Sequence, residues 1–211
     1  MNWLTTVALL FQATPAVTPP AGTPASIVEV NIEQQSVEQW KVIDSRTVFK
    51  PGDEIRFRFQ STMGGYVYVV NRSPAGEYRR LFPTGETGSL NRIDANRPYT
   101  VPSSDGSFVI PPNPGFETIF WVLSPTPMVE DVIARSLPGR TKSTLIPKCD
   151  PGPLTARGAC IDSSAGAKAP PKGSGLTSRD LNPDGTPESA AVRFVGLQER
   201  ALVYEFWIAH H

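Results

Sequence analysis

The sequence predicts an all-β fold, an immunoglobulin-like β-sandwich of short antiparallel strands with one short helix and a long Pro/Gly-rich insertion. Three observations support this prediction. Apolar and polar residues alternate in many segments, which is the period of a strand with one buried face. Turn signals recur about every 8 to 12 residues, as in a sandwich. The 22 prolines and 17 glycines exceed the total of roughly 25 at average composition, so long helices have little room.

The clearest strand lies at residues 54–60, where the alternation is unbroken and Ile55, Phe57 and Phe59 share one face. That face should be buried, with the intervening arginines in solvent. The turn at residues 73–76 has proline and glycine at favoured positions, so the segments on either side should pair as a hairpin. In the first two thirds of the chain, strands are expected at 27–33, 40–44, 54–60, 66–70, 78–82, 99–101, 108–110 and 116–123.

One helix is expected at residues 128–137, directly after Pro127, where Met128, Val132 and Ile133 share a face. Strands resume at 191–195 and 201–209, and we expect them to form a closing hairpin. The second of these strands is so apolar that it should be central in a sheet.

Residues 138–190 differ in composition from the rest of the chain. Of these 53 residues, 15 are proline or glycine and none is aromatic. Such a segment buries too little apolar surface to offset the entropy of ordering it. We therefore expect a low-order insertion at 138–190 and one β-sandwich domain formed by 27–137 together with 191–211.

The N-terminus resembles a secretory signal peptide. Residues 3–11 form a short, mostly apolar run that ends before a Pro/Thr/Ala-rich stretch, although no Lys or Arg precedes the run. We expect a signal peptide at 1–16, a linker at 17–26, and a mature protein in the periplasm or outside the cell. The apolar run is shorter than the ~20 residues of a membrane span, so no span should remain after signal removal.

The two cysteines, Cys149 and Cys160, are separated by ten residues rich in proline and glycine. A disulfide between them closes easily and suits an exported protein. Two alternatives stay open, namely unpaired thiols and a metal site. A zinc site would need two more ligands, and the only histidines are His210 and His211.

The charge balance argues against binding of nucleic acid by bulk charge. The chain has 20 Lys and Arg and 20 Asp and Glu, so its formal net charge is zero. The expected partner is a protein or an envelope polymer. Exposed aromatic residues, among which Trp40, Tyr78 and Tyr99 are candidates, could contact it, although each could equally belong to the core.

Catalytic residues are not evident, and we expect no enzyme. His210 and His211 are the last two residues, where fraying is expected, so an oriented catalytic imidazole has little support. Four carboxylates lie in the β region and could in principle serve a hydrolase. Their neighbours are turn and strand-end residues, so a solvated face is the better interpretation for Asp53, Glu54, Asp94 and Glu117.

One segment is similar to the first half of a calcium loop. Oxygen-bearing residues occupy its first, third, fifth and seventh positions, a glycine occupies the sixth, and an acidic residue follows, giving Asp180, Asn182, Asp184, Thr186 and Glu188 as candidate ligands. The twelfth position is Ala191, where a glutamate would be needed. Since Asn-Pro-Asp-Gly is also a favoured turn, a plain β-turn stays open, and calcium is the one cofactor that we consider.

Four segments in order carry a family resemblance: 49–57, 65–71, 76–83 and 98–102. Their shared motif residues are Pro51, Gly52, Asp53, Gly65, Tyr66, Tyr68, Leu81, Phe82 and Pro83. Over about residues 47–125 the chain resembles domain-of-unknown-function family 4384. The resemblance implies no catalytic residues in the domain, which in relatives often stands behind a kinase or caspase-like peptidase domain or on exported proteins. The same residues suit a structural role in turns and strand ends.

These observations together predict an exported, non-catalytic β-sandwich that acts as a binding or scaffold module of the cell envelope. Two alternatives remain. One is a carboxylate-dependent hydrolase that acts on envelope polymers, and the other is a calcium-stabilised adhesion or matrix component.

Overall fold

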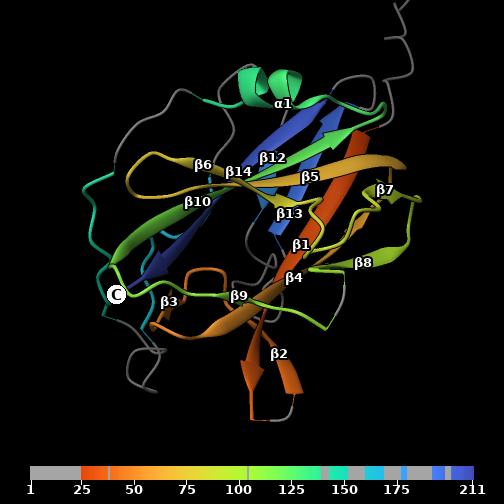
Figure 1. Cartoon of the computed structure of the whole chain (residues 1–211). Helices are drawn as coiled ribbons and strands as arrows, with labels where there is room; N and C mark the ends of the chain where they lie inside the picture. Colours follow the sequence, from red (N-terminus) through yellow and green to blue (C-terminus); the bar gives the residue numbers. More distant parts are fainter. Residues whose placement is uncertain are drawn as a thin grey trace, which may run out of the picture.

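The computed structural model of the chain describes residues 25–37, 39–103, 105–138, 143–151, 160–168, 177–179, 192–197 and 201–211. Within these ranges the chain forms two seven-stranded sheets that pack face to face, and one short helix (Figure 1). The prediction of an all-β sandwich is confirmed.

The first sheet runs in the order β12 (Thr177–Arg179), β13 (Val192–Leu197), β1 (Ala25–Ser36), β4 (Glu54–Ser61) and β8 (Pro98–Val101), with β2 (Gln39–Ile43) beside β1 and β9 (Phe108–Val109) beside β4. The second runs in the order β11 (Gly166–Ala167), β14 (Leu202–His210), β10 (Gly115–Ser124), β5 (Gly65–Arg72) and β6 (Tyr78–Phe82), with β3 (Val48–Phe49) beside β14 and β7 (Arg92–Ile93) beside β5.

The topology is that of an immunoglobulin-like sandwich. In chain order, β1, β4, β5, β6, β8, β10 and β14 take the places of strands A, B, C, C′, E, F and G, because β1, β4 and β8 are neighbours in one sheet and β14, β10, β5 and β6 in the other. All these pairings are antiparallel. The short strand β3 instead pairs with β14 in parallel.

The core lies between the two sheets and follows the alternation of the strands. In β4, Ile55, Phe57 and Phe59 are buried, as predicted. From the other sheet, Trp121 packs edge-on against Phe57 with the ring centroids 5.5 Å apart. Tyr204 of β14 belongs to the same cluster.

Part of the outer face of the second sheet is also covered, which explains the uninterrupted apolar runs in β5 and β10. Helix α1 (Glu130–Ser136) lies against this face, with buried Ile133 in a cluster that includes Tyr68 and Phe120 (Figure 1). The backbone N–H of Met128 donates a hydrogen bond of 2.7 Å to the Tyr68 hydroxyl and so fixes the segment that enters the helix.

The predicted closing hairpin is wrong. β13 pairs with β1 in the first sheet, whereas β14 pairs with β10 in the second. A short connection in the sequence can join two strands of one sheet as a hairpin, and it can equally join two strands of opposite sheets. Here the register of β14 with β10 places the inward residues Tyr204, Phe206 and Ile208 in the core.

Parts of the segment 138–190 have regular backbone pairing, which its composition had not led us to expect. β11 pairs with β14, β12 pairs with β13, and the backbone N–H of Val48 donates to the carbonyl of Cys160 at 2.8 Å. Backbone hydrogen bonds at sheet edges thus replace the apolar burial that these residues cannot supply.

The predicted signal peptide lies outside the described residues, and β1 begins at Ala25, inside the predicted linker. β1 and β2 extend together beyond the sandwich as a hairpin, at the bottom of Figure 1. In the part of the chain that the structure describes, no helix is long and apolar enough to cross a membrane.

Candidate functional site

A hollow of about 280 Å³ opens on the outer face of the second sheet. Three neighbouring strands form its floor, and the segment that follows α1 forms its other side. The lining residues are Arg72, Phe116, Thr118, Ser143, Thr144, Leu145 and Trp207. We call this site the Arg72 hollow.

Strand register brings three of these side chains into one row across the sheet. Thr118 of β10 stands opposite Arg72 of β5 on one side and opposite Trp207 of β14 on the other. Residues opposite one another in antiparallel strands point to the same face of the sheet. The row therefore presents a guanidinium, a hydroxyl and an indole side by side.

Arg72 is fixed in position at the floor of the hollow. The residue is only 9% exposed, and its Nη2 donates to Thr118 Oγ1 at 3.2 Å. Its guanidinium carbon lies 5.3 Å from the ring centroid of Phe120, and Nη2 lies 3.8 Å from Oε1 of Glu205. Nη2 makes both polar contacts, the guanidinium also lies over the Phe120 ring, and together these contacts reduce the rotamer entropy that a ligand would have to remove.

Glu205 links Arg72 to Trp207, because its Oε1 also accepts a 2.6 Å hydrogen bond from Nε1 of the indole. The Trp207 ring contacts Phe116 at a centroid distance of 5.5 Å and carries Nζ of Lys168 at 3.7 Å from its centroid. Two cations and one carboxylate thus lie on or beside the hollow.

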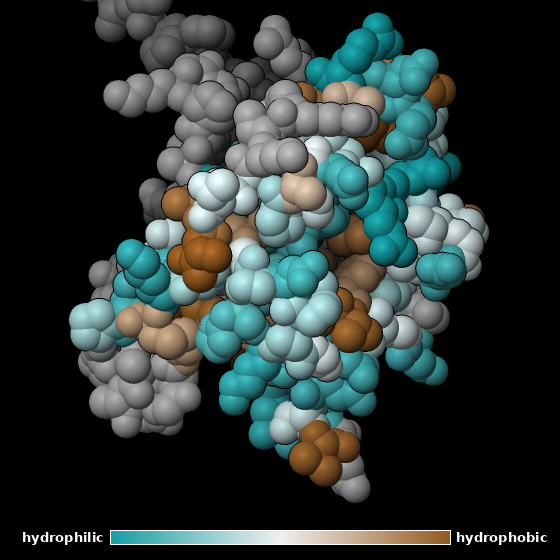
Figure 2. Space-filling model, turned by 60° about the vertical axis from the view of Figure 1, so that its left-hand side comes forward, coloured by the Kyte–Doolittle hydropathy of each residue, from teal (hydrophilic) through white to brown (hydrophobic). Residues whose placement is uncertain are grey.

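One of the residues that line the Arg72 hollow is an exposed aliphatic residue. Leu145 is 53% exposed. On the face shown in Figure 2, apolar side chains form small patches separated by hydrophilic ones, so they do not merge into one large patch. The exposed aliphatic side chain of Leu145 is therefore a local feature of this site.

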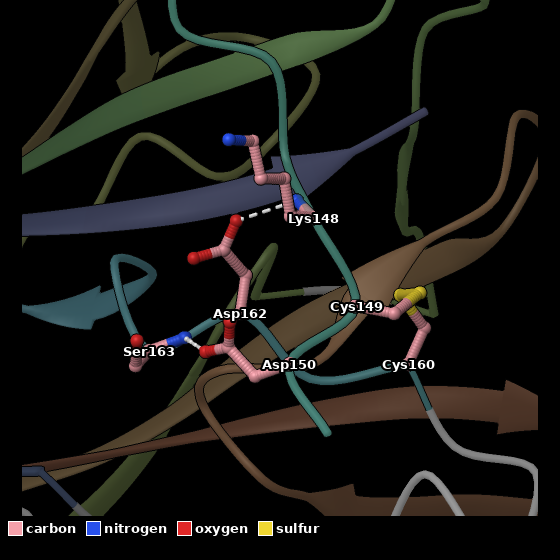
Figure 3. Close-up of a disulfide and its surroundings, with 6 residues drawn as sticks. All are labelled: Lys148, Cys149, Asp150, Cys160, Asp162 and Ser163. Carbon is pink, nitrogen blue, oxygen red and sulfur yellow. Dashed lines mark hydrogen bonds between the residues drawn. A yellow bond between two sulfur atoms is a disulfide. The ribbon is translucent and has the colours of Figure 1, made fainter.

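A disulfide fixes the segment that carries Ser143 to Leu145. Cys149 and Cys160 are bonded, as predicted (Figure 3). Buried Asp162 accepts hydrogen bonds of 2.7 Å from the backbone N–H groups of Lys148 and Ser164. The backbone N–H of Ser163 donates to Asp150 at 2.6 Å, and this bond lowers the pKa of the Asp150 carboxyl below its usual value. The segment is thereby connected to the edge of the second sheet.

A second hollow, of about 380 Å³, lies near the start of β5. It is lined by Gly64, Gly65, Tyr66, Arg92, Ile93, Asp94, Ala95, Pro125, Thr126 and Pro127. Its charged residues are exposed, and Asp94 already pairs with Arg97 at 3.6 Å. Because it has no fixed charged group at its floor, it is the weaker candidate.

The motif residues singled out in the sequence occupy turns, strand ends and the core. Gly52 has a φ of +85°, and the backbone N–H of Lys50 donates to the Asp53 carboxylate at 2.8 Å, which closes the turn before β4. Gly65 and Tyr66 line the second hollow, and Tyr68 is buried under α1. Pro51 lies in the same turn as Gly52, and Leu81, Phe82 and Pro83 lie at or just after the end of β6.

Residues 48–127 match the family described as Domain of unknown function (DUF4384). The match agrees with the resemblance found in the motif residues. No curated protein and no solved structure matches the chain.

The DUF4384 region spans β3 to β10 and supplies only part of the Arg72 hollow. Arg72, Phe116 and Thr118 lie inside the region, whereas Trp207 and the segment from Ser143 lie outside it. The second hollow, in contrast, lies wholly within the DUF4384 region.

The structure places the four carboxylates in separate surroundings, all of them within the DUF4384 region. Asp53 closes a turn, Glu54 accepts from the Ser107 hydroxyl at 2.6 Å, and Asp94 lies beside Tyr99. The expectation of a solvated face is wrong for Glu117, whose side chain is 14% exposed and accepts a 2.7 Å hydrogen bond from Nδ2 of Asn71. Its position in β10 points it inward, on the same face of the sheet as the core residues Ile119 and Ile208.

His210 is not frayed, contrary to expectation. It is the last residue of β14, is fully buried, and has Nε2 3.6 Å from Oε1 of Glu117. The apolar run that predicts a strand up to residue 209 was the sequence signal that the adjacent His210 would be ordered. Outside the DUF4384 region, the calcium candidates Asp180, Asn182, Asp184, Thr186 and Glu188 lie outside the described residues. Among the described residues, no group of three His, Cys, Asp or Glu side chains could hold a metal.

Proposed function

We propose that this protein is an exported, non-catalytic binding module of the cell envelope. The observation that carries the proposal is the disulfide between Cys149 and Cys160. Disulfides form and persist in oxidising compartments and are rare in the cytosol of most organisms. The signal-like residues 3–11 point to the same compartment.

A binding role is supported by the Arg72 hollow, since a fold alone does not define a function and the argument must come from a site. The hollow is concave, is lined by both polar and apolar side chains, and contains one arginine that contacts three neighbours. A few oriented polar groups in an apolar cavity are typical of ligand sites.

Export and oxidation can be tested together in cells that express the full chain. The cells are fractionated after free thiols have been blocked with a mass-tagging maleimide, and the protein is detected by immunoblot. We expect a shortened protein in the periplasmic or secreted fraction that takes up no tag until it is reduced. A Cys149→Ser variant serves as the control and should take up one tag without reduction. A full-length protein that remains in the cytoplasm and labels at both cysteines would contradict the proposal.

A further inference from the structure

We infer that the Arg72 hollow binds a carboxylate joined to a compact apolar group, as found at the C-terminal residue of a peptide with an aliphatic side chain. The inference deepens the proposed function and rests on it, because it takes this hollow as the binding site of the module.

The charges of the site favour a monoanion. Among the described residues that line the hollow or contact its Trp207 wall, Arg72 and Lys168 are cationic and Glu205 is anionic. A bound carboxylate is attracted by these cations and brings a single negative charge close to Glu205. A phosphate dianion would bring two negative charges close to the same carboxylate.

Arginine suits a carboxylate for geometric reasons. A guanidinium has five N–H donors in a planar fork that matches the two oxygens of a carboxylate. The Arg72 contacts with Thr118, Glu205 and Phe120 already determine its plane. The hydroxyls of Thr118, Ser143 and Thr144 line the same space and can donate to a bound oxygen.

The walls of the hollow favour an aliphatic group over a flat ring. One face of the Trp207 indole carries the ammonium of Lys168, and Phe116 packs against the indole at an interplanar angle of 54°. A sugar ring needs an open aromatic face to stack on, and these contacts occupy the indole. Together with Leu145, the two rings instead enclose a space suited to a branched aliphatic side chain.

The size of the hollow agrees with one residue. A volume of about 280 Å³ equals the space of about nine waters at ~30 Å³ each, which is the scale of one carboxylate and its aliphatic side chain. The side chain of Leu145 lines the hollow and is also exposed, so it can contact the preceding residue of a peptide.

The test is a titration of the purified mature protein, labelled with ¹⁵N, with the peptide acetyl-Gly-Gly-Leu. The reporter is the indole N–H signal of Trp207, assigned through a Trp207→Phe variant. The same peptide with a C-terminal amide and inorganic phosphate are titrated in parallel. We expect the acid to shift the Trp207 signal and to bind at least about tenfold more tightly than the amide, because the amide loses the charge-assisted hydrogen bonds.

Two variants locate the binding. Arg72→Gln should reduce acid binding to the level of the amide. If that variant does not fold, Leu145→Asp provides the second test, since it places a negative charge at the exposed edge and should weaken the acid more than the amide. Arg79→Gln changes an exposed arginine outside the lining residues and is the matched control, with unchanged affinity.

Equal affinity for acid and amide, stronger binding of phosphate, or no shift of the Trp207 signal at millimolar peptide would overturn the inference. These outcomes are independent of the proposed function. An exported, oxidised protein that ignores the peptide removes only the ligand class, whereas a reduced cytoplasmic protein removes the proposed function whatever the titration gives.

Discussion

The imidazole of His210 lies 3.6 Å from the carboxylate of Glu117 in the interior of the sandwich, measured from Nε2 to Oε1. Asn71 donates to the other oxygen of the same carboxylate at 2.7 Å. Within the described part of the chain, neither ring nitrogen of His210 makes a hydrogen bond, although both are buried. The carboxylate is therefore held by the amide, and the imidazole contributes little polar stabilisation.

His210→Leu should leave the free energy of unfolding unchanged or raise it by up to about 1 kcal/mol, because an unsatisfied buried polar ring is replaced by an apolar group. Glu117→Leu should instead lower it by about 1 to 3 kcal/mol, because the Asn71 amide loses its acceptor. Urea unfolding at neutral pH measures both. A loss of several kcal/mol for His210→Leu would show that the imidazole has a partner that stabilises the fold.

Alkaline pH should destabilise the protein through Tyr204. Burial raises the pKa of the Tyr204 hydroxyl well above its ordinary value of 10.0, so the folded state favours the neutral phenol. The stabilisation is complete below pH 10, where the unfolded phenol is also neutral, and decreases as the pH rises from there towards the folded pKa. The decrease is about 1.4 kcal/mol per pH unit for one such group.

Tyr204→Phe should remove the contribution of this phenol to the loss of stability at alkaline pH. Urea unfolding at a series of pH values from 8 to about 11.5 measures the change. Tyr66→Phe, at a half-exposed position, is the control and should keep the wild-type slope. If the free energy of unfolding falls with pH equally in wild type and in Tyr204→Phe, other groups cause the loss of stability at alkaline pH.

Gly65→Ala should destabilise the sandwich by about 1 to 3 kcal/mol, as forced overpacking does. A Cβ at Gly65 would lie 2.4 Å from the backbone oxygen of Ser124, its neighbour across the β5–β10 ladder, and backbone cannot move aside cheaply. Gly85→Ala is the matched control, because no heavy atom lies within 4 Å of a Cβ there. Thermal unfolding should give a lower melting temperature for Gly65→Ala than for Gly85→Ala. Equal melting temperatures would show that the contact with Ser124 does not explain why residue 65 is glycine.

Removal of the disulfide should cost up to about 3 kcal/mol in the chain-entropy estimate for a loop of this length. The change is the double variant Cys149→Ser/Cys160→Ser, whose positions are 11 residues apart. Hydrogen exchange should accelerate most at the Val48 amide, which donates to the Cys160 carbonyl. A reducing agent should lower the stability of wild type to that of the variant and leave the variant unchanged. Equal stability of oxidised and reduced wild type would contradict this expectation.

Most of the fold could be predicted from local patterns. The alternation at residues 54–60, the turn at 73–76 and the apolar run at 201–209 each contain their own signal, and the structure has a strand or hairpin at each. The closing hairpin could not be predicted correctly, because the choice between one sheet and two depends on partners far away in the sequence. For the same reason, composition alone missed the pairing of β11 and β12 with sheet edges.

The candidate site was largely beyond local reasoning. Arg72 carries no signal of its own in the sequence, and Trp207 is only one residue of the apolar strand expected at 201–209. They become neighbours because the registers of β5 and β14 both place them opposite Thr118. The contact between Glu117 and His210 was missed for a similar reason, since the two residues meet only across the ladder of β10 and β14.

Strands of the DUF4384 region pair with strands that precede and follow the region in the chain. This arrangement determines when each sheet can form during synthesis. Within the region, β4 needs β1, which precedes it, and β10 needs β14, which comes from the last described residues. A fragment of residues 48–127 would therefore leave β4 and β10 each with an open hydrogen-bonding edge, a template for aggregation. During synthesis the first sheet can start to form early, whereas the second must wait for β14. The order of the strands thus keeps the second sheet incomplete until β14 has been synthesised.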